Sequence, residues 1–137
     1  LEALAGPTIT FLGRVPDDDL PDLFARCRAF VLPGREDFSI APVQAQAAGR
    51  PVIAYRGGGA FDTVINGKTG VFFDEQTPEA LVAAVRAFVP ESINPEDCRA
   101  NAKRFAVQVF KERLGRVIEA VLSPDKETRR HGDTETF

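Results

Sequence analysis

The sequence has little of the chemistry that marks several common enzyme classes. Its 137 residues contain a single histidine, His131, and only two cysteines, Cys27 and Cys98. His131 lies in a polar C-terminal tail, which excludes a Ser-His-Asp or Cys-His arrangement. The cysteines lie in apolar helical patterns without a histidine cluster, so we expect core thiols. A disulfide or a metal site is the alternative.

Net charge and long apolar runs are also scarce. The formal net charge is only -3, which argues against a nucleic-acid partner or a polybasic membrane anchor. No apolar run approaches the roughly 20 residues that cross a bilayer. The first residues lack the charged and apolar regions of a signal peptide. We therefore expect a cytoplasmic globular protein.

What the sequence does contain is an alternation of short apolar runs and helical patterns. We expect strands at residues 8–12, 29–32, 52–55 and 71–73. Helices are expected after the aspartates at 17–19, at about 40–48, 60–65 and 77–88, and from 94 onward. This order predicts an α/β fold, a Rossmann-like parallel sheet with helices on both faces. We assign residues 1–122 to this domain and 123–137 to a polar, disordered tail.

In sheets of this kind ligands bind beyond the carboxyl ends of the strands, so the loops at 13–15, 33–39 and 56–60 are candidates. The second loop leads into a helix, where backbone N–H groups near Phe38 to Ile40 are suited to a phosphate. The alternative is a plain turn in which Ser39 or Asp37 caps the helix.

Glu36 and Gln44 are the polar residues that bracket this helix start. A carboxylate beside an anion site is repulsive unless it faces hydroxyls, such as those of a sugar, and the alternative is a solvated surface glutamate. Gln44 either reaches the same pocket or faces solvent. The glycines at 57–59 permit close backbone approach to a ligand, or simply form a flexible loop. The aspartates at 17–19 favour a helix start over a metal site.

The segment from about residue 9 to residue 110 resembles the C-terminal domain of the retaining, nucleotide-sugar-dependent glycosyltransferases of the GT-B fold, the "glycosyl transferases group 1" family. The resemblance is strongest in the stretch REDFSIAPVQAQAAGRPVIAYRGGG. The family pattern has two glutamates with seven residues between them, followed by A-x-A-x-G-x-P-V-I-A. Here it reads Glu36, Phe38, Ser39, Pro42 and Gln44, and then residues 45–54. The sequence of this stretch is most similar to that of mannosyltransferase-like members.

The resemblance implies which residues hold the donor sugar and its diphosphate. Glu36 matches the first glutamate and would be the catalytic-site residue that hydrogen-bonds the sugar hydroxyls. Phe38, Ser39 and Ile40 would offer backbone amides to the sugar and diphosphate. Gly58 would border the sugar pocket.

The nucleotide contacts are implied in the same way. Gly13, Arg14 and Val15 match the loop that lies along the base, and Gln44 matches the glutamate that holds the ribose hydroxyls. An amide at this position loses a charge-assisted hydrogen bond, worth about 1 kcal/mol. Ser39 replaces a glycine of the family pattern, so its Cβ crowds the backbone approach. No metal ion or other cofactor is expected.

We therefore expect the donor-binding part of a transferase that moves a hexose from a nucleoside-diphosphate sugar to an acceptor hydroxyl. GDP-mannose is the favoured donor, with UDP- and ADP-sugars as alternatives. The chain starts later than the family's C-terminal domain and lacks the N-terminal GT-B domain, so we expect it to be inactive alone and open to self-association. In the intact enzyme the resemblance implies a cytoplasmic location at the inner face of the membrane. The alternatives are a non-catalytic interaction domain and an unrelated α/β nucleotide-binding module.

Overall fold

A computed structural model describes residues 2–123 of the chain, and a parallel sheet of three strands lies within the unit that ends at residue 103. The register places Leu32 beside Ala54, and Ala54 beside Phe72. Crossover helices join these parallel strands, as they must, because a tight turn cannot connect parallel neighbours. The strands in their order across the sheet are β1 (Phe30–Leu32), β2 (Val52–Tyr55) and β3 (Gly70–Phe73).

The central strand β2 is buried on both faces. Val52 and Ala54 are fully buried on one face, and Ile53 is 2% exposed on the other. The main apolar cluster lies on the first face, where Leu32 and Val64 join these side chains. A continuous apolar run is typical of a strand covered on both sides, as β2 is.

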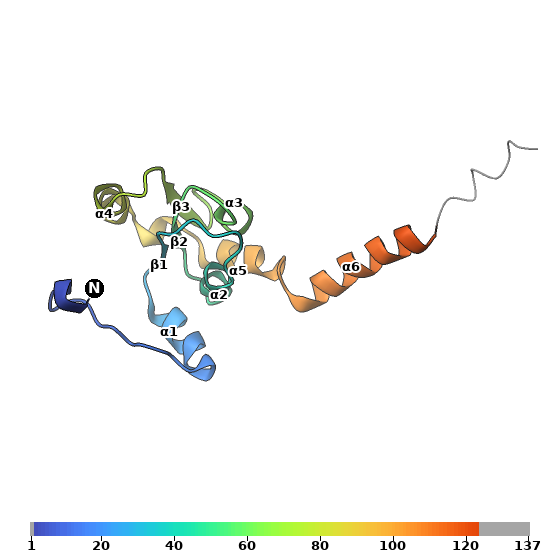
Figure 1. Cartoon of the computed structure of the whole chain (residues 1–137), viewed down its shortest axis with the longest axis horizontal. Helices are drawn as coiled ribbons and strands as arrows, with labels where there is room; N and C mark the ends of the chain where they lie inside the picture. The colour runs from blue at the N-terminus through green and yellow to red at the C-terminus, as the bar shows by residue number, and fades with distance from the viewer. Residues whose placement is uncertain (1, 124–137) are drawn as a thin grey trace, which may run out of the picture. The chain divides into compact units, whose positions relative to one another are not determined.

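The helices cover both faces of the sheet, as predicted. Helix α2 packs against β1, β2 and α5, while α4 packs against β3. Figure 1 shows α4 on one side of the strands and the α2–α5 pair on the other. The helix predicted at 77–88 is α4, and Thr77 caps it, because the Ala80 N–H donates to Thr77 Oγ1 at 3.2 Å. The helices around the sheet are α1 (Leu20–Arg26), α2 (Ala41–Ala47), α3 (Ala60–Thr63), α4 (Pro78–Ala87) and α5 (Pro95–Lys103), and the short 3-10 turns are η1 (Glu2–Leu4), η2 (Asp17–Asp19) and η3 (Pro90–Ser92).

The strand predicted at residues 8–12 is wrong. This segment has no regular secondary structure, and its side chains Ile9, Phe11 and Leu12 are 48–57% exposed. Its β-branched and aromatic residues favour extended backbone, but a strand also needs a neighbour for its N–H and C=O groups. No strand among the described residues pairs with it.

Of the described residues, those up to 103 belong to one unit and those from 104 to 123 belong to a second. Its described part contains α6 (Val107–Leu122), an amphipathic helix with an apolar stripe. Leu114 and Ile118 on this stripe are 44% and 47% exposed. No helix in the described part of the chain is long and apolar enough to cross a membrane. The tail predicted at 123–137 lies outside the described residues beyond Ser123, and the domain boundary at 122 stays a prediction.

Candidate functional site

The loops that follow β1 and β2 meet at the carboxyl end of the sheet through direct backbone contact. The Gly59 N–H donates a hydrogen bond to the Glu36 carbonyl oxygen at 2.7 Å. A Cβ on Gly58 would lie 2.1 Å from that same oxygen, and a Cβ on Gly59 would lie 2.2 Å from the Asp37 carbonyl oxygen. Gly58 also has a φ of +56°, which other residues rarely adopt. The glycine run is therefore a fitted contact surface between two loops, not a flexible linker.

This contact fixes the backbone of Glu36 and leaves its side chain exposed. Glu36, Phe38 and Ile40 are all exposed, while Ser39 is half-buried. The structure thus brings the predicted sugar and diphosphate residues together: Glu36, the segment from Phe38 to Ile40, and Gly58. An exposed carboxylate can accept hydrogen bonds from hydroxyl groups, and a fixed backbone leaves only its side chain to be ordered on binding.

Helix α2 starts directly after this loop, at Ala41. Its N-cap residue is Ile40, whose side chain has no oxygen to accept from the first-turn N–H groups. The alternative in which Ser39 or Asp37 occupies the cap position is therefore wrong. The reason is that the chain turns one residue later than predicted, so an apolar residue occupies that position.

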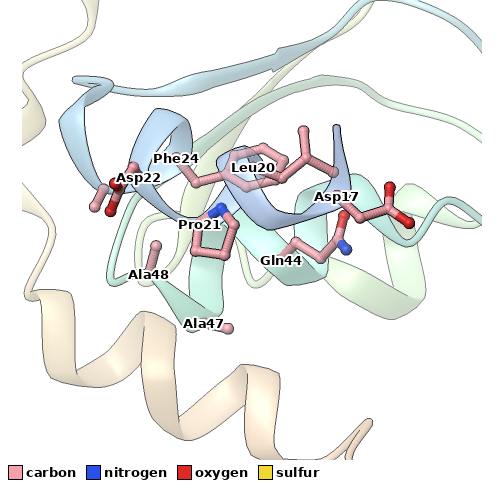
Figure 2. Close-up of a pocket in the computed structure, with 9 residues that line it drawn as sticks. Asp17, Leu20, Pro21, Asp22, Phe24, Gln44, Ala47 and Ala48 are labelled. Atoms are coloured by element: carbon pink, nitrogen blue, oxygen red, sulfur yellow. The ribbon is translucent and has the colours of Figure 1, made fainter. Parts of the chain in front are cut away.

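A hollow of about 480 Å³ lies between the η2–α1 segment and α2. In Figure 2, Asp17 and Gln44 are drawn toward one end of it and Asp22 toward the other. The walls between these polar groups are apolar, so the hollow suits a flat or aliphatic group that carries hydrogen-bond donors. Its carboxylates disfavour a phosphate. The lining residues are Asp17, Leu20, Pro21, Asp22, Phe24, Ala25, Gln44, Ala47 and Ala48.

The predicted nucleotide residues are only partly brought together here. Gln44 lines the hollow, but Gly13, Arg14 and Val15 do not. They form the turn that precedes η2, with Gly13 at a φ of +62°. Asp17 does line the hollow, although its sequence context indicated only a helix start. The sequence carried no signal that would distinguish this pocket carboxylate from its neighbours at 18 and 19.

The cation closest in sequence to the glycine loop already has partners. Arg56 forms an ion pair with Asp74, and its guanidinium lies 5.0 Å from the centroid of the Phe72 ring. These contacts hold Arg56 against β3, where both partners lie in or directly after the strand. This tethered side chain lies where the glycine loop leaves the sheet.

The cysteines behave as predicted. Both are free thiols, with Cys98 fully buried and Cys27 half-buried. Burial raises the pKa of each thiol, and at Cys27 the nearby Arg50 opposes this effect. The predicted disulfide alternative is therefore wrong. Among residues 2–123, no three metal-ligating side chains of the His, Cys, Asp or Glu type gather into a cluster.

Comparison with known proteins gives the same family as the sequence motifs. Residues 1–105 match the profile of the family described as "Glycosyl transferases group 1". The chain is 27% identical over 117 residues to the alpha-1,3/1,6-mannosyltransferase ALG2 of Dictyostelium discoideum, which covers 81% of this chain and 28% of that protein. It is 35% identical over 85 residues to a GDP-mannose-dependent alpha-(1-6)-phosphatidylinositol monomannoside mannosyltransferase of Mycolicibacterium smegmatis, covering 56% of this chain and 22% of that protein.

The fold comparison agrees. The structure superposes on a sucrose-phosphate synthase from Thermosynechococcus elongatus with a TM-score of 0.74 and 25% identity, covering 82% of this chain and 30% of that one. The chain thus spans less than a third of the length of these relatives. The profile match covers most of the chain, and the chain therefore belongs to the glycosyl transferases group 1 family.

Proposed function

We propose that this chain is the donor-binding part of a retaining glycosyltransferase that moves a hexose from a nucleoside-diphosphate sugar to an acceptor hydroxyl. The observation that carries the proposal is the backbone contact of Gly58 and Gly59 with Glu36 and Asp37. It gathers an exposed carboxylate, the loop that precedes a helix and a glycine wall at the sheet end where α/β proteins bind ligands.

In this proposal Glu36 accepts hydrogen bonds from the donor sugar's hydroxyls. Backbone N–H groups of Phe38, Ser39 and Ile40 bind the sugar and diphosphate, and they stabilise the charge that grows on the departing diphosphate. Gly58 borders the sugar. No metal ion or cofactor is needed for these roles.

The nucleotide would lie beside α2, with Gln44 at the ribose and the turn of Gly13, Arg14 and Val15 along the base. The match to a relative named as GDP-mannose-dependent favours GDP-mannose as donor, with UDP- and ADP-sugars as alternatives. Transfer also needs an acceptor held in register, which we assign to a second domain of the intact enzyme. We therefore propose that the isolated chain binds donor but does not catalyse transfer.

The test is a titration of the chain with GDP, UDP, ADP and GDP-mannose, followed by amide chemical shifts. We expect shifts at Phe38 through Gln44, at Gly58 and Gly59, and at the turn of Gly13, Arg14 and Val15. The absence of any shift at millimolar ligand would contradict the proposal. The variant Glu36→Gln should weaken the binding of GDP-mannose more than the binding of GDP. Glu75→Gln, an equal charge change at another exposed acid, should alter neither affinity.

A second candidate is a non-catalytic interaction domain. The exposed apolar side chains of Ile9, Phe11 and Leu12 favour it, because exposed apolar groups that lie together mark association sites. Sedimentation velocity separates the two candidates: the interaction domain predicts concentration-dependent association and no nucleotide shifts. The donor-binding proposal predicts the nucleotide shifts at every concentration.

A further inference from the structure

Three buried polar side chains lie together behind the glycine loop. Gln46 on α2 is 0% exposed, Thr63 on α3 is 1% exposed and Asn101 on α5 is 4% exposed. Buried amides destabilise a core unless their donors and acceptors are satisfied. The hydrogen-bond partners of these side chains therefore show which parts of the backbone the cluster stabilises.

The common acceptor of the cluster is the carbonyl oxygen of Thr63. It receives hydrogen bonds from Gln46 Nε2 at 2.7 Å and from Asn101 Nδ2 at 2.9 Å. Asn101 Nδ2 also donates to Gln46 Oε1 at 2.7 Å, and Gln46 Nε2 donates to the Pro42 carbonyl at 3.2 Å. Each of the two amides thus has partners on a helix other than its own.

Thr63 is the last residue of α3, a helix of only four residues. The final carbonyls of a helix have no partner within the helix, and so short a helix is not stable by itself. The side chains of Gln46 and Asn101 supply that missing partner. They bind the C-terminal end of α3 from two neighbouring helices.

The other end of α3 reaches the candidate donor site. Thr63 Oγ1 donates to the Gly59 carbonyl oxygen at 3.1 Å, and the Gly59 N–H donates to the Glu36 carbonyl oxygen at 2.7 Å. A continuous set of hydrogen bonds therefore runs from Asn101 on α5, through Thr63 and Gly59, to the backbone of Glu36.

We propose that Gln46, Thr63 and Asn101 are positioning residues that set the glycine loop against Glu36 and thereby shape the donor sugar subsite. This inference rests on the proposed donor-binding function. Apolar side chains would fill the same core volume, but they would give the Thr63 carbonyl no donor and would leave the Gly59 carbonyl with backbone donors alone. Directional bonds in a buried network select one arrangement of the loop.

The test compares Gln46→Met, which keeps the volume and helix propensity, and Thr63→Val, which keeps the shape and removes only the hydroxyl. The control is Val43→Ala, which shortens another buried side chain of α2 that has no polar atom to join the network. Amide hydrogen exchange is measured at Gly59, which reports the loop contact, and at Val52, whose N–H bonds the Thr69 carbonyl at 3.1 Å within the sheet.

We expect both cluster variants to lower protection of the Gly59 amide relative to that of Val52, by about tenfold in Gln46→Met. The control should leave this ratio unchanged. In parallel, GDP-mannose should bind the cluster variants several-fold more weakly while GDP binds as before, because the sugar meets the displaced loop.

Equal losses of protection at Gly59 and Val52 in both cluster variants, as for a core residue without a directional role, would overturn the inference. The milder variant Thr63→Val keeps this comparison available even where Gln46→Met unfolds the chain. If the unaltered chain binds no nucleotide, the proposed function fails. The hydrogen-exchange comparison still decides whether the cluster positions the loop: a selective loss of protection at Gly59 supports this role, and an equal loss at both amides contradicts it.

Discussion

Gln44 and Gln46 lie two residues apart on α2, yet they have opposite surroundings. Gln44 is exposed and lines an open hollow beside Asp17, whereas Gln46 is fully buried and hydrogen-bonded to residues of α3 and α5. The outer side of α2 is open, and small changes there alter what can bind. The inner side is closed, and changes there alter the backbone that builds the site.

The largest effect on stability is expected where the glycine loop contacts the backbone of Glu36. Gly58→Ala would place a Cβ 2.1 Å from the Glu36 carbonyl and force a non-glycine residue to a φ of +56°. We expect a loss of about 3 kcal/mol or more in the free energy of unfolding. Urea denaturation followed by circular dichroism measures it.

The matched control for this variant is Gly67→Ala. Gly67 has a φ of +73°, but a Cβ there would have no atom within 4 Å. This control carries only the backbone strain, about 1 kcal/mol. Equal destabilisation by the two variants would show that the loop contact is not tight.

The second effect is a direct comparison of the two glutamines. Gln46→Ala removes the hydrogen bonds to Thr63 and Asn101 and leaves a cavity, so we expect about 2 kcal/mol of destabilisation. Gln44→Ala should change the free energy of unfolding by less than about 0.5 kcal/mol, as is usual at exposed positions. Similar losses of unfolding free energy in the two variants would contradict the distinction between the inner and outer sides of α2.

A smaller effect concerns binding on the outer side. Gln44→Glu supplies a charge-assisted acceptor for ribose hydroxyls, so we expect nucleotide to bind roughly fivefold more tightly. Isothermal titration with GDP and UDP measures it. Gln108→Glu, the same charge change on α6, is the control and should leave affinity unchanged. An unchanged affinity in Gln44→Glu would remove Gln44 from the ribose site.

The smallest effect is in thiol chemistry, which reports burial without altering the site. Burial raises the pKa of both Cys27 and Cys98, so each has less thiolate at neutral pH than the unfolded chain has. We expect slow alkylation by iodoacetamide that accelerates as the pH rises, with half-buried Cys27 ahead of fully buried Cys98. Faster labelling of Cys98 would show that α5 opens locally and that the inner side of α2 is not closed.

Much of the fold was predictable because its signals are local. The apolar runs at β1, β2 and β3 are short and bounded by turn residues, and the helix start at Thr77 has its own capping side chain. The segment at 8–12 had the same local signal and still forms no strand. Pairing depends on a neighbouring strand elsewhere in the chain, and composition does not report that.

The candidate site was predictable to a similar degree. Loops at the carboxyl ends of parallel strands lie together by topology, so Glu36 and Gly58 were expected at one place, as observed. The buried role of Gln46 was not found. Its only sequence signal is its spacing on the face of Pro42 and Val43, while the partner that makes burial favourable, Asn101, is 55 positions away.

The bond between Gln46 and Asn101 also constrains how this chain can evolve. Asn101 Nδ2 donates to Gln46 Oε1, so replacing either residue by an apolar one removes a buried hydrogen-bond partner from the other. Substitutions at these two positions should therefore be inherited together among relatives. Relatives with an apolar residue at position 46 should also lack a buried amide at position 101, and their α3 should end on a different cap.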